Sequence, residues 1–113
     1  MCTQSQLNNI LASVAHTARE TLGDKLREVI LYGSYARGDY DEESDIDIMV
    51  LADIPAEECW EYRSRMSEDI SRLNLDNDVL LSVAVKDCHT FDKWFSVLPF
   101  YQNVRNEGVV ISA

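Results

Sequence analysis

Two short motifs in the first half of the chain contain residue types that bind phosphate groups and metal ions. The first is Gly33-Ser34, and the second is Asp45-Ile46-Asp47, with ten residues between the two. A glycine lets backbone N–H groups approach phosphate oxygens, and Ser34 adds a hydroxyl at the start of a helical turn that favours an anion. Paired carboxylates can hold divalent cations. Together the motifs predict a site for a metal-bound nucleotide.

The spacing of the two aspartates predicts that both carboxylates point the same way. Ile46, Ile48 and Val50 recur with a period of two, which indicates a half-buried strand with Asp45 and Asp47 on its other face. Residues two apart on a strand are separated by roughly 6.5 Å. Two carboxylates at that separation can hold ions roughly 3.5–4 Å apart. Without cations, their negative charges repel each other.

The combined motif resembles that of the DNA polymerase beta superfamily of nucleotidyltransferases. The chain is similar to the minimal nucleotidyltransferase (MNT) domains of this superfamily, which also includes kanamycin nucleotidyltransferase. Gly33, Ser34, Asp45 and Asp47 match the Gly-Ser and Asp-x-Asp positions one for one. The resemblance implies an α/β (α+β) fold, with a short mixed β-sheet flanked by helices. It also implies two Mg²⁺ ions, an NTP substrate, and transfer of an NMP group, expected to be AMP, to a hydroxyl acceptor with release of pyrophosphate.

The resemblance further implies a third carboxylate on the strand beside the Asp-x-Asp strand. There it would complete the metal coordination and help to deprotonate the acceptor hydroxyl. The strand expected over residues 79–85 offers Asp78 at its start and Ser82 on the same face. Asp78 is our candidate for this metal ligand and catalytic residue. If Ser82 is the true counterpart, one metal loses an anionic ligand, and catalysis falls far more than nucleotide binding.

Other candidate residues have weaker signals. Arg37 is predicted to bind a nucleotide phosphate, because a guanidinium can contact phosphate oxygens in a bidentate manner, and a local ion pair is an equal alternative. Tyr35 and Tyr40 could line the pocket or pack against it. Cys88 and His89 lie at a strand end with no second pair of ligands in sequence, so a loop position is favoured over a metal site.

Hydrophobic periodicity predicts the elements that position these residues. Helices are expected over 7–22, 55–74 and 100–106, and a short helix carrying Phe91, Trp94 and Phe95 is expected after a capping Thr90. Strands are expected over 27–32, 45–51 and 79–85, followed by a terminal extended segment at 109–111. The alternation of helices and strands favours an α/β or α+β domain.

Length and charge restrict the class of partner. A chain of 113 residues makes one domain, 1–113, with no room for a second substrate lobe. Its 20 acidic and 10 basic residues give a formal net charge of -10, which repels nucleic acids and anionic membranes. A small-molecule or protein acceptor is therefore favoured over a nucleic acid.

The cysteines and the N-terminal residues bear on the compartment. Cys2, Cys59 and Cys88 are odd in number and widely spaced, which predicts neither a disulfide framework nor a zinc site. The first six residues do not resemble a signal peptide, and no apolar run is long enough to span a membrane. We therefore expect a cytoplasmic protein.

The resemblance also implies a partner. Small domains of this family are commonly encoded with a HEPN-domain partner in toxin–antitoxin pairs, so the resemblance implies an antitoxin that adenylylates a HEPN toxin. One alternative is a catalytically weak or inactive module that uses the same fold to sequester a partner protein. A second alternative, resistance chemistry of the kanamycin type, is disfavoured because the chain lacks a further domain to enclose such a substrate.

Overall fold

A mixed four-stranded sheet forms the centre of the computed structural model, which describes residues 3–112. Its strands are β1 (Leu26–Tyr32), β2 (Ile46–Ala52), β3 (Leu81–Asp87) and β4 (Val109–Ser112), in the spatial order β3-β2-β1-β4. β1 is antiparallel to both β2 and β4, whereas β2 and β3 are parallel. The predicted mixed sheet is confirmed, and the terminal extended segment is its edge strand.

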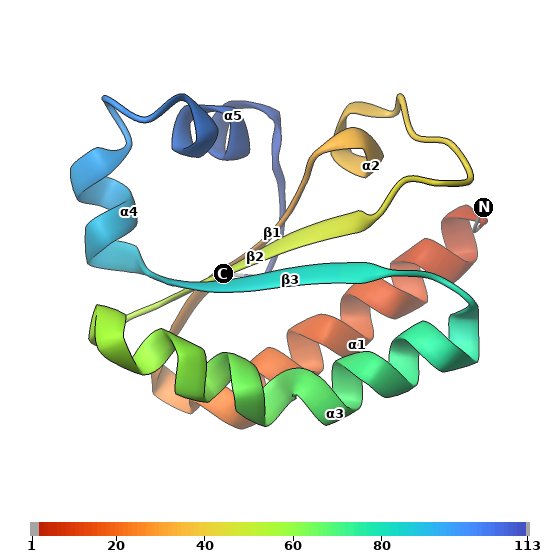
Figure 1. Cartoon of the computed structure of the whole chain (residues 1–113), viewed down its shortest axis with the longest axis horizontal. Coiled ribbons are helices and arrows are strands. Elements are labelled where there is room, and N and C mark those ends of the chain that lie inside the picture. The colour runs from red at the N-terminus through yellow and green to blue at the C-terminus, as the bar shows by residue number, and fades with distance from the viewer. Residues whose placement is uncertain (1–2, 113) are drawn as a thin grey trace.

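Helices cover both faces of this sheet (Figure 1). The long helices α1 (Gln4–Leu22) and α3 (Cys59–Asn77) pack side by side on one face. The short helices α2 (Ser34–Arg37), α4 (Cys88–Trp94) and α5 (Pro99–Glu107) lie on the other. Single 3₁₀ turns at Gly23–Lys25 and Ala56–Glu58 connect α1 to β1 and β2 to α3. Among residues 3–112, no helix has the length and apolar character needed to cross a bilayer.

The two faces of β2 contact two separate hydrophobic clusters. Ile46, Ile48 and Val50 belong to the larger cluster beneath α1 and α3. Met49 and Leu51 belong to a smaller cluster with Phe91 of α4 and Val104 of α5. The predicted alternation is therefore correct, but β2 is half-buried only at its start and is buried on both faces beyond Asp47, because α4 and α5 cover the second face. Asp47 is thus held at the boundary between solvent and core.

The third strand begins later than the sequence predicts. α3 runs past residue 74 to Asn77, and Asp78 ends it in the left-handed conformation with φ 52°. The N–H of Leu81 then donates to the side chain of Asn74 (2.9 Å), which starts β3. Asp78 therefore lies before the strand. The apolar residues Val79 and Leu80 made the predicted strand too long at its start.

The start of α4 also differs from the prediction. Asp87 caps this helix, accepting the N–H of His89 at 3.0 Å and the hydroxyl of Thr90 at 2.8 Å. The prediction of Thr90 as the cap is wrong, because an aspartate three residues earlier takes that place. Cys88 and His89 are the first helical residues rather than a loop.

Candidate active site

β1 leads directly into the turn at Gly33. This glycine has φ 74° and ψ -156°, a conformation that side chains strongly disfavour. Its carbonyl accepts the N–H groups of Ala36 (3.1 Å) and Arg37 (3.0 Å), so Ser34 becomes the first residue of α2. The predicted turn followed by a short helical segment is confirmed.

The two sequence motifs touch each other. Asp47 pairs with Tyr32 across the antiparallel ladder, which brings its side chain beside the Gly33 turn. A Cβ atom on Gly33 would overlap the Asp47 carboxylate, with Oδ2 as its nearest atom. The sequence predicts that Gly33 allows phosphate oxygens to approach the backbone. The structure adds a second requirement, because only glycine leaves room for this carboxylate.

A cavity of 330 Å³ opens at this contact. Its walls include Gly33, Ser34, Arg37 and Asp47 from the two motifs, and Phe100, Asn103 and Glu107 from α5. The volume lies at the lower end of the roughly 300–1,000 Å³ usual for small-molecule sites. Asn103 and Glu107 are site residues that the sequence motifs did not predict. Their spacing with Phe100 by three and four residues could have indicated a shared helix face.

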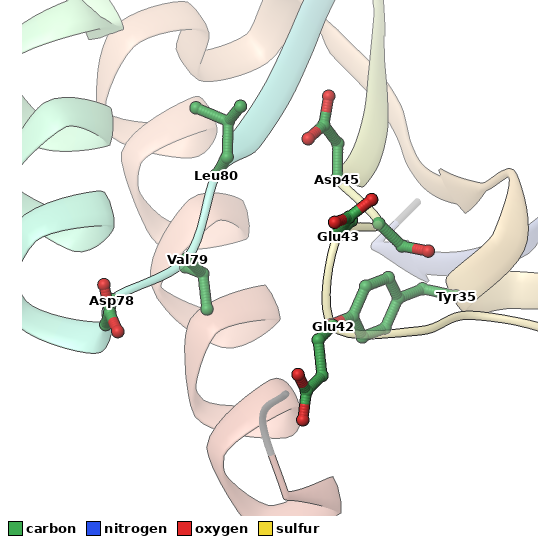
Figure 2. A pocket seen from close by; sticks show the side chains of 8 residues that line it. Tyr35, Glu42, Glu43, Asp45, Asp78, Val79 and Leu80 are labelled. Atoms are coloured by element: carbon green, nitrogen blue, oxygen red, sulfur yellow. The ribbon is translucent and has the colours of Figure 1, made fainter.

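Asp45 and Asp78 line a neighbouring cavity of 340 Å³. Figure 2 shows them on opposite sides of it, with Asp78 on the segment between α3 and β3 and Asp45 just before β2. Glu42 and Glu43 add two more carboxylates to its wall. The structure therefore brings Asp45 and Asp78 to one cavity, but Asp47 is not among the residues that line it.

Ser82 lies beside Asp47 on the adjacent strand. The parallel register of β2 and β3 pairs Asp47 with Ser82 and Ile46 with Leu81, so Asp78 falls before the first of these pairs. Both side chains proposed for the third position are exposed. A role for Asp78 as third ligand stays a prediction, and Ser82 occupies the place directly next to Asp47.

The electrostatics of Asp47 suit a cation site. Burial first and the negative charge of Asp45 second raise the pKa of Asp47 above its usual value, and the positive charge of Arg37 opposes this shift. The folded protein therefore disfavours the ionised form of Asp47 relative to the unfolded chain, and a bound cation would offset this cost. The donors on this side of the sheet are carboxylate oxygens, the ligand type preferred by Mg²⁺.

Arg37 forms ion pairs across the cavity. Its guanidinium contacts Asp39 at 3.2 Å and Glu107 of α5 at 3.2 Å, and the side chain is 43% exposed. The local ion-pair alternative is therefore present in the structure, and phosphate binding by Arg37 stays a prediction. Tyr35 is buried and stacks on Tyr40 with ring centroids 4.2 Å apart, and Tyr35 also lines the cavity that contains Asp45.

We expect Gly33→Ala to weaken nucleotide binding far more than Gly38→Ala does. Both glycines have positive φ, so both substitutions strain the backbone, by about 1–3 kcal/mol. Only the Cβ at Gly33 meets Asp47, whereas a Cβ at Gly38 has open space around it. Calorimetric titration of each variant with a magnesium nucleotide checks this expectation. Equal affinities in the two variants would contradict the importance of the contact between Gly33 and Asp47.

Comparison with known proteins identifies relatives over most of the chain. The sequence model of the family "Nucleotidyltransferase domain" matches residues 16–96. A candidate protein adenylyltransferase of Methanocaldococcus jannaschii is 47% identical over 91 residues, which cover 80% of this chain and 83% of that protein. A second from the same organism is 36% identical over 87 residues, covering 77% of this chain and 79% of the relative.

Solved structures share the fold at lower identity. A toxin–antitoxin crystal structure with AMP-PNP matches with a TM-score of 0.56 and 23% identity, covering 91% of this chain and 73% of that one. A complex of a tri-AMPylated Shewanella oneidensis HEPN toxin with its MNT antitoxin matches with a TM-score of 0.51 and 23% identity, covering 96% and 71% of the two chains. These likenesses confirm the predicted fold.

Proposed function

The chain belongs to the nucleotidyltransferase domain family, and on this premise we propose that it transfers AMP from magnesium-bound ATP to a hydroxyl group of a partner protein. Its relatives of 47% and 36% identity are both named as candidate protein adenylyltransferases, which supports AMP as the group and a protein as the acceptor. The observation that carries the proposal is the contact of the Gly33 turn with Asp47 at the wall of one cavity.

In this proposal each motif has its own task. Gly33 and Ser34 bind the terminal phosphates of ATP, and Arg37 exchanges Glu107 for a phosphate oxygen, since a guanidinium contacts both anions with the same geometry. Asp45 and Asp47 hold the Mg²⁺ ions. When bound, these ions stabilise negative charge on the α-phosphate and on the leaving pyrophosphate.

The acceptor hydroxyl forms the new bond to the α-phosphorus. The bond from that phosphorus to the bridging oxygen breaks, and both of its electrons leave with pyrophosphate. A carboxylate near the acceptor takes the hydroxyl proton, and Asp78 is our candidate because it lines the cavity that also contains Asp45. Asp78 is exposed, so an acceptor from another molecule can reach it.

The acceptor we propose is a HEPN-domain protein. The solved complex in which an MNT antitoxin is bound to a tri-AMPylated HEPN toxin supports this choice.

One observation favours the second candidate, a binding module with weak or no transferase activity. The residue beside Asp47 on the adjacent strand is Ser82, and a serine hydroxyl is a poorer Mg²⁺ ligand than a carboxylate. In that case the chain would still bind nucleotide and partner, but transfer would be slow.

Two differently labelled ATP molecules test the proposed reaction. The chain is incubated with Mg²⁺ and a HEPN-domain protein, with ATP labelled on either the α- or the γ-phosphate. We expect label on the partner from α-labelled ATP alone, because the γ-phosphate leaves in pyrophosphate. A stable complex without label would favour the binding module, and label from γ-labelled ATP would indicate phosphoryl transfer instead.

A further inference from the structure

A second cluster of metal-binding side chains lies at the other end of β2 and β3. The two strands are parallel, so their carboxyl ends meet, and Ala52 pairs with Asp87 in the last register position. Asp53 follows β2, and Cys88 and His89 follow β3. Asp45 and Asp47 lie at the start of β2, so this cluster is separated from the proposed active site by the length of the strand.

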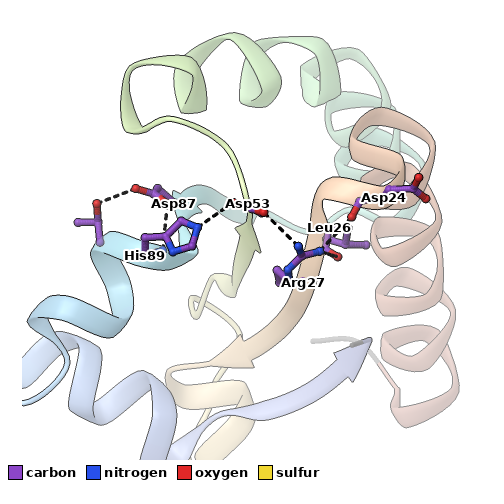
Figure 3. A network of polar contacts seen from close by, with 7 residues as sticks. Asp24, Leu26, Arg27, Asp53, Asp87 and His89 are labelled. Carbon is purple, nitrogen blue, oxygen red and sulfur yellow. Dashed lines mark hydrogen bonds and ion pairs between the residues drawn. The ribbon is translucent and has the colours of Figure 1, made fainter.

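The potential ligand atoms of these three residues converge. Each residue offers one ligand atom, and the three atoms lie within 4.8 Å of one another. Nε2 of His89 is 2.8 Å from Oδ1 of Asp53, a pair that Figure 3 shows joined across the strand ends. Asp53 and His89 are exposed and Cys88 is partly exposed, so an ion from solvent can reach all three.

We propose that Asp53, Cys88 and His89 form a binding site for a divalent transition metal ion of the zinc class, with solvent in the fourth position. Zinc accepts thiolate, imidazole and carboxylate ligands at about 2.0–2.3 Å. Neighbouring ligands of a tetrahedral ion at that distance are about 3.3 Å or more apart. An ion entering between His89 and Asp53 therefore requires a small separation of these two side chains from their present 2.8 Å contact. Ligand atoms of the cluster that now lie up to 4.8 Å apart must draw closer.

Neighbouring groups already fix the orientation of the proposed ligands. Arg27 donates to Oδ2 of Asp53 at 3.1 Å, which leaves Oδ1 directed at the cluster (Figure 3). Asp87 accepts the backbone N–H of His89 at 3.0 Å and the hydroxyl of Thr90 at 2.8 Å, which holds the first turn of α4 in place. Such outer contacts orient ligands in metal sites and raise their affinity.

The negative charges around the cluster attract a divalent cation and disfavour a thiolate that has no cation bound to it. Asp53, Asp87 and Asp92 place negative charge around Cys88, and Arg27 is the opposing positive charge. The same carboxylates attract a cation. On binding, the thiol gives its proton to solvent as the bond from sulfur to metal forms. A thiolate ligand also selects against Mg²⁺, which prefers oxygen, so the site differs in chemistry from Asp45 and Asp47.

Titration with Co²⁺ tests this site without reference to enzyme activity. Co²⁺ bound to a thiolate gives a charge-transfer band in the near ultraviolet. Excess Mg²⁺ in the buffer occupies sites made of carboxylates alone and so keeps Co²⁺ out of them. A Cys2→Ser background removes the thiol outside the described residues. In that background we expect a saturable band that added Zn²⁺ abolishes. Cys88→Ser should remove the band, whereas the matched variant Cys59→Ser should keep it.

Substitution of the other two proposed ligands, Asp53 and His89, should weaken Co²⁺ binding without abolishing it. We expect Asp53→Asn and His89→Gln each to weaken Co²⁺ binding at least about tenfold. Changes to residues that only orient the ligands already lower metal affinity by about 10–100-fold. The control His16→Gln changes a histidine that also pairs with a carboxylate, Glu20 at 3.6 Å, and should leave the affinity unchanged. Absence of the band, its survival in Cys88→Ser, or its loss in Cys59→Ser would overturn the proposal.

Discussion

Asp47→Asn is expected to lower the rate of AMP transfer by at least about 10³-fold, because metal stabilisation of the reacting phosphate contributes several kcal/mol and each 1.4 kcal/mol is a factor of ten. Asp45→Asn should have an effect of similar size. The α-labelled ATP assay measures both. Asp69→Asn is the matched control, since it removes an exposed carboxylate of α3 that pairs only weakly with Arg72, at 3.5 Å.

The same variants should lose the stabilisation that ligand provides. A magnesium nucleotide at about 100 times its dissociation constant adds about 2.7 kcal/mol of stability. In a domain of this size that raises Tm by about 10 °C. Asp45→Asn and Asp47→Asn should show little or none of this shift, and Asp69→Asn should show all of it. An undiminished shift in both active-site variants would remove the metal assignment.

Without ligand, Asp47→Asn should be at least as stable as the wild type at neutral pH. Burial and Asp45 raise the pKa of Asp47 in the folded state above the usual 3.8, so the folded protein holds this proton more tightly than the unfolded chain does. The contribution of Asp47 to stability therefore falls as pH rises from below 3.8 through the raised pKa. The asparagine variant lacks this loss, which urea unfolding at acidic and neutral pH can measure.

Local sequence patterns predicted the parts of the fold and the site that depend on near neighbours. The alternation along β2 placed Ile46 and Ile48 on one face and Asp47 on the other, and the structure confirms both faces. The turn at Gly33 followed from the behaviour of glycine itself. The overlap of a Gly33 side chain with Asp47 was not predictable from either motif alone, because it depends on the register between β1 and β2.

Contacts between residues that are far apart in the sequence could not be predicted from local patterns. Cys88 and His89 gave only a weak metal signal because their third potential ligand, Asp53, lies 35 positions before Cys88 and approaches only through the parallel pairing of β2 with β3. Glu107 likewise reaches Arg37 only because α5 packs across the same face. The late start of β3 had a different cause, since an aspartate in the left-handed conformation ended α3 where glycine is more usual.

Substitutions of Asp78 and Ser82 test which residue takes the place of the third carboxylate. Asp78→Asn is expected to lower AMP transfer by at least about 10²-fold, the usual effect of losing a general base, while nucleotide affinity changes much less. The neighbouring control Ser82→Ala should leave transfer within a few-fold of the wild type. The expectation follows from the position of Asp78 on the wall of the cavity that contains Asp45, where an acceptor can approach from solvent.

The pairing of β2 with β3 favours Ser82 for the third position, and the two substitutions would then have the opposite effects. Ser82 lies directly beside Asp47, so a carboxylate placed there would be next to a proposed metal ligand. If Ser82 occupies the third position, wild-type transfer is slow, Asp78→Asn leaves it unchanged, and Ser82→Asp raises both metal affinity and transfer. Wild-type activity in Asp78→Asn, together with a gain of transfer in Ser82→Asp, would refute the role proposed for Asp78. The chain would then be a nucleotidyltransferase weakened at one ligand, because a serine hydroxyl carries no charge to hold the ion.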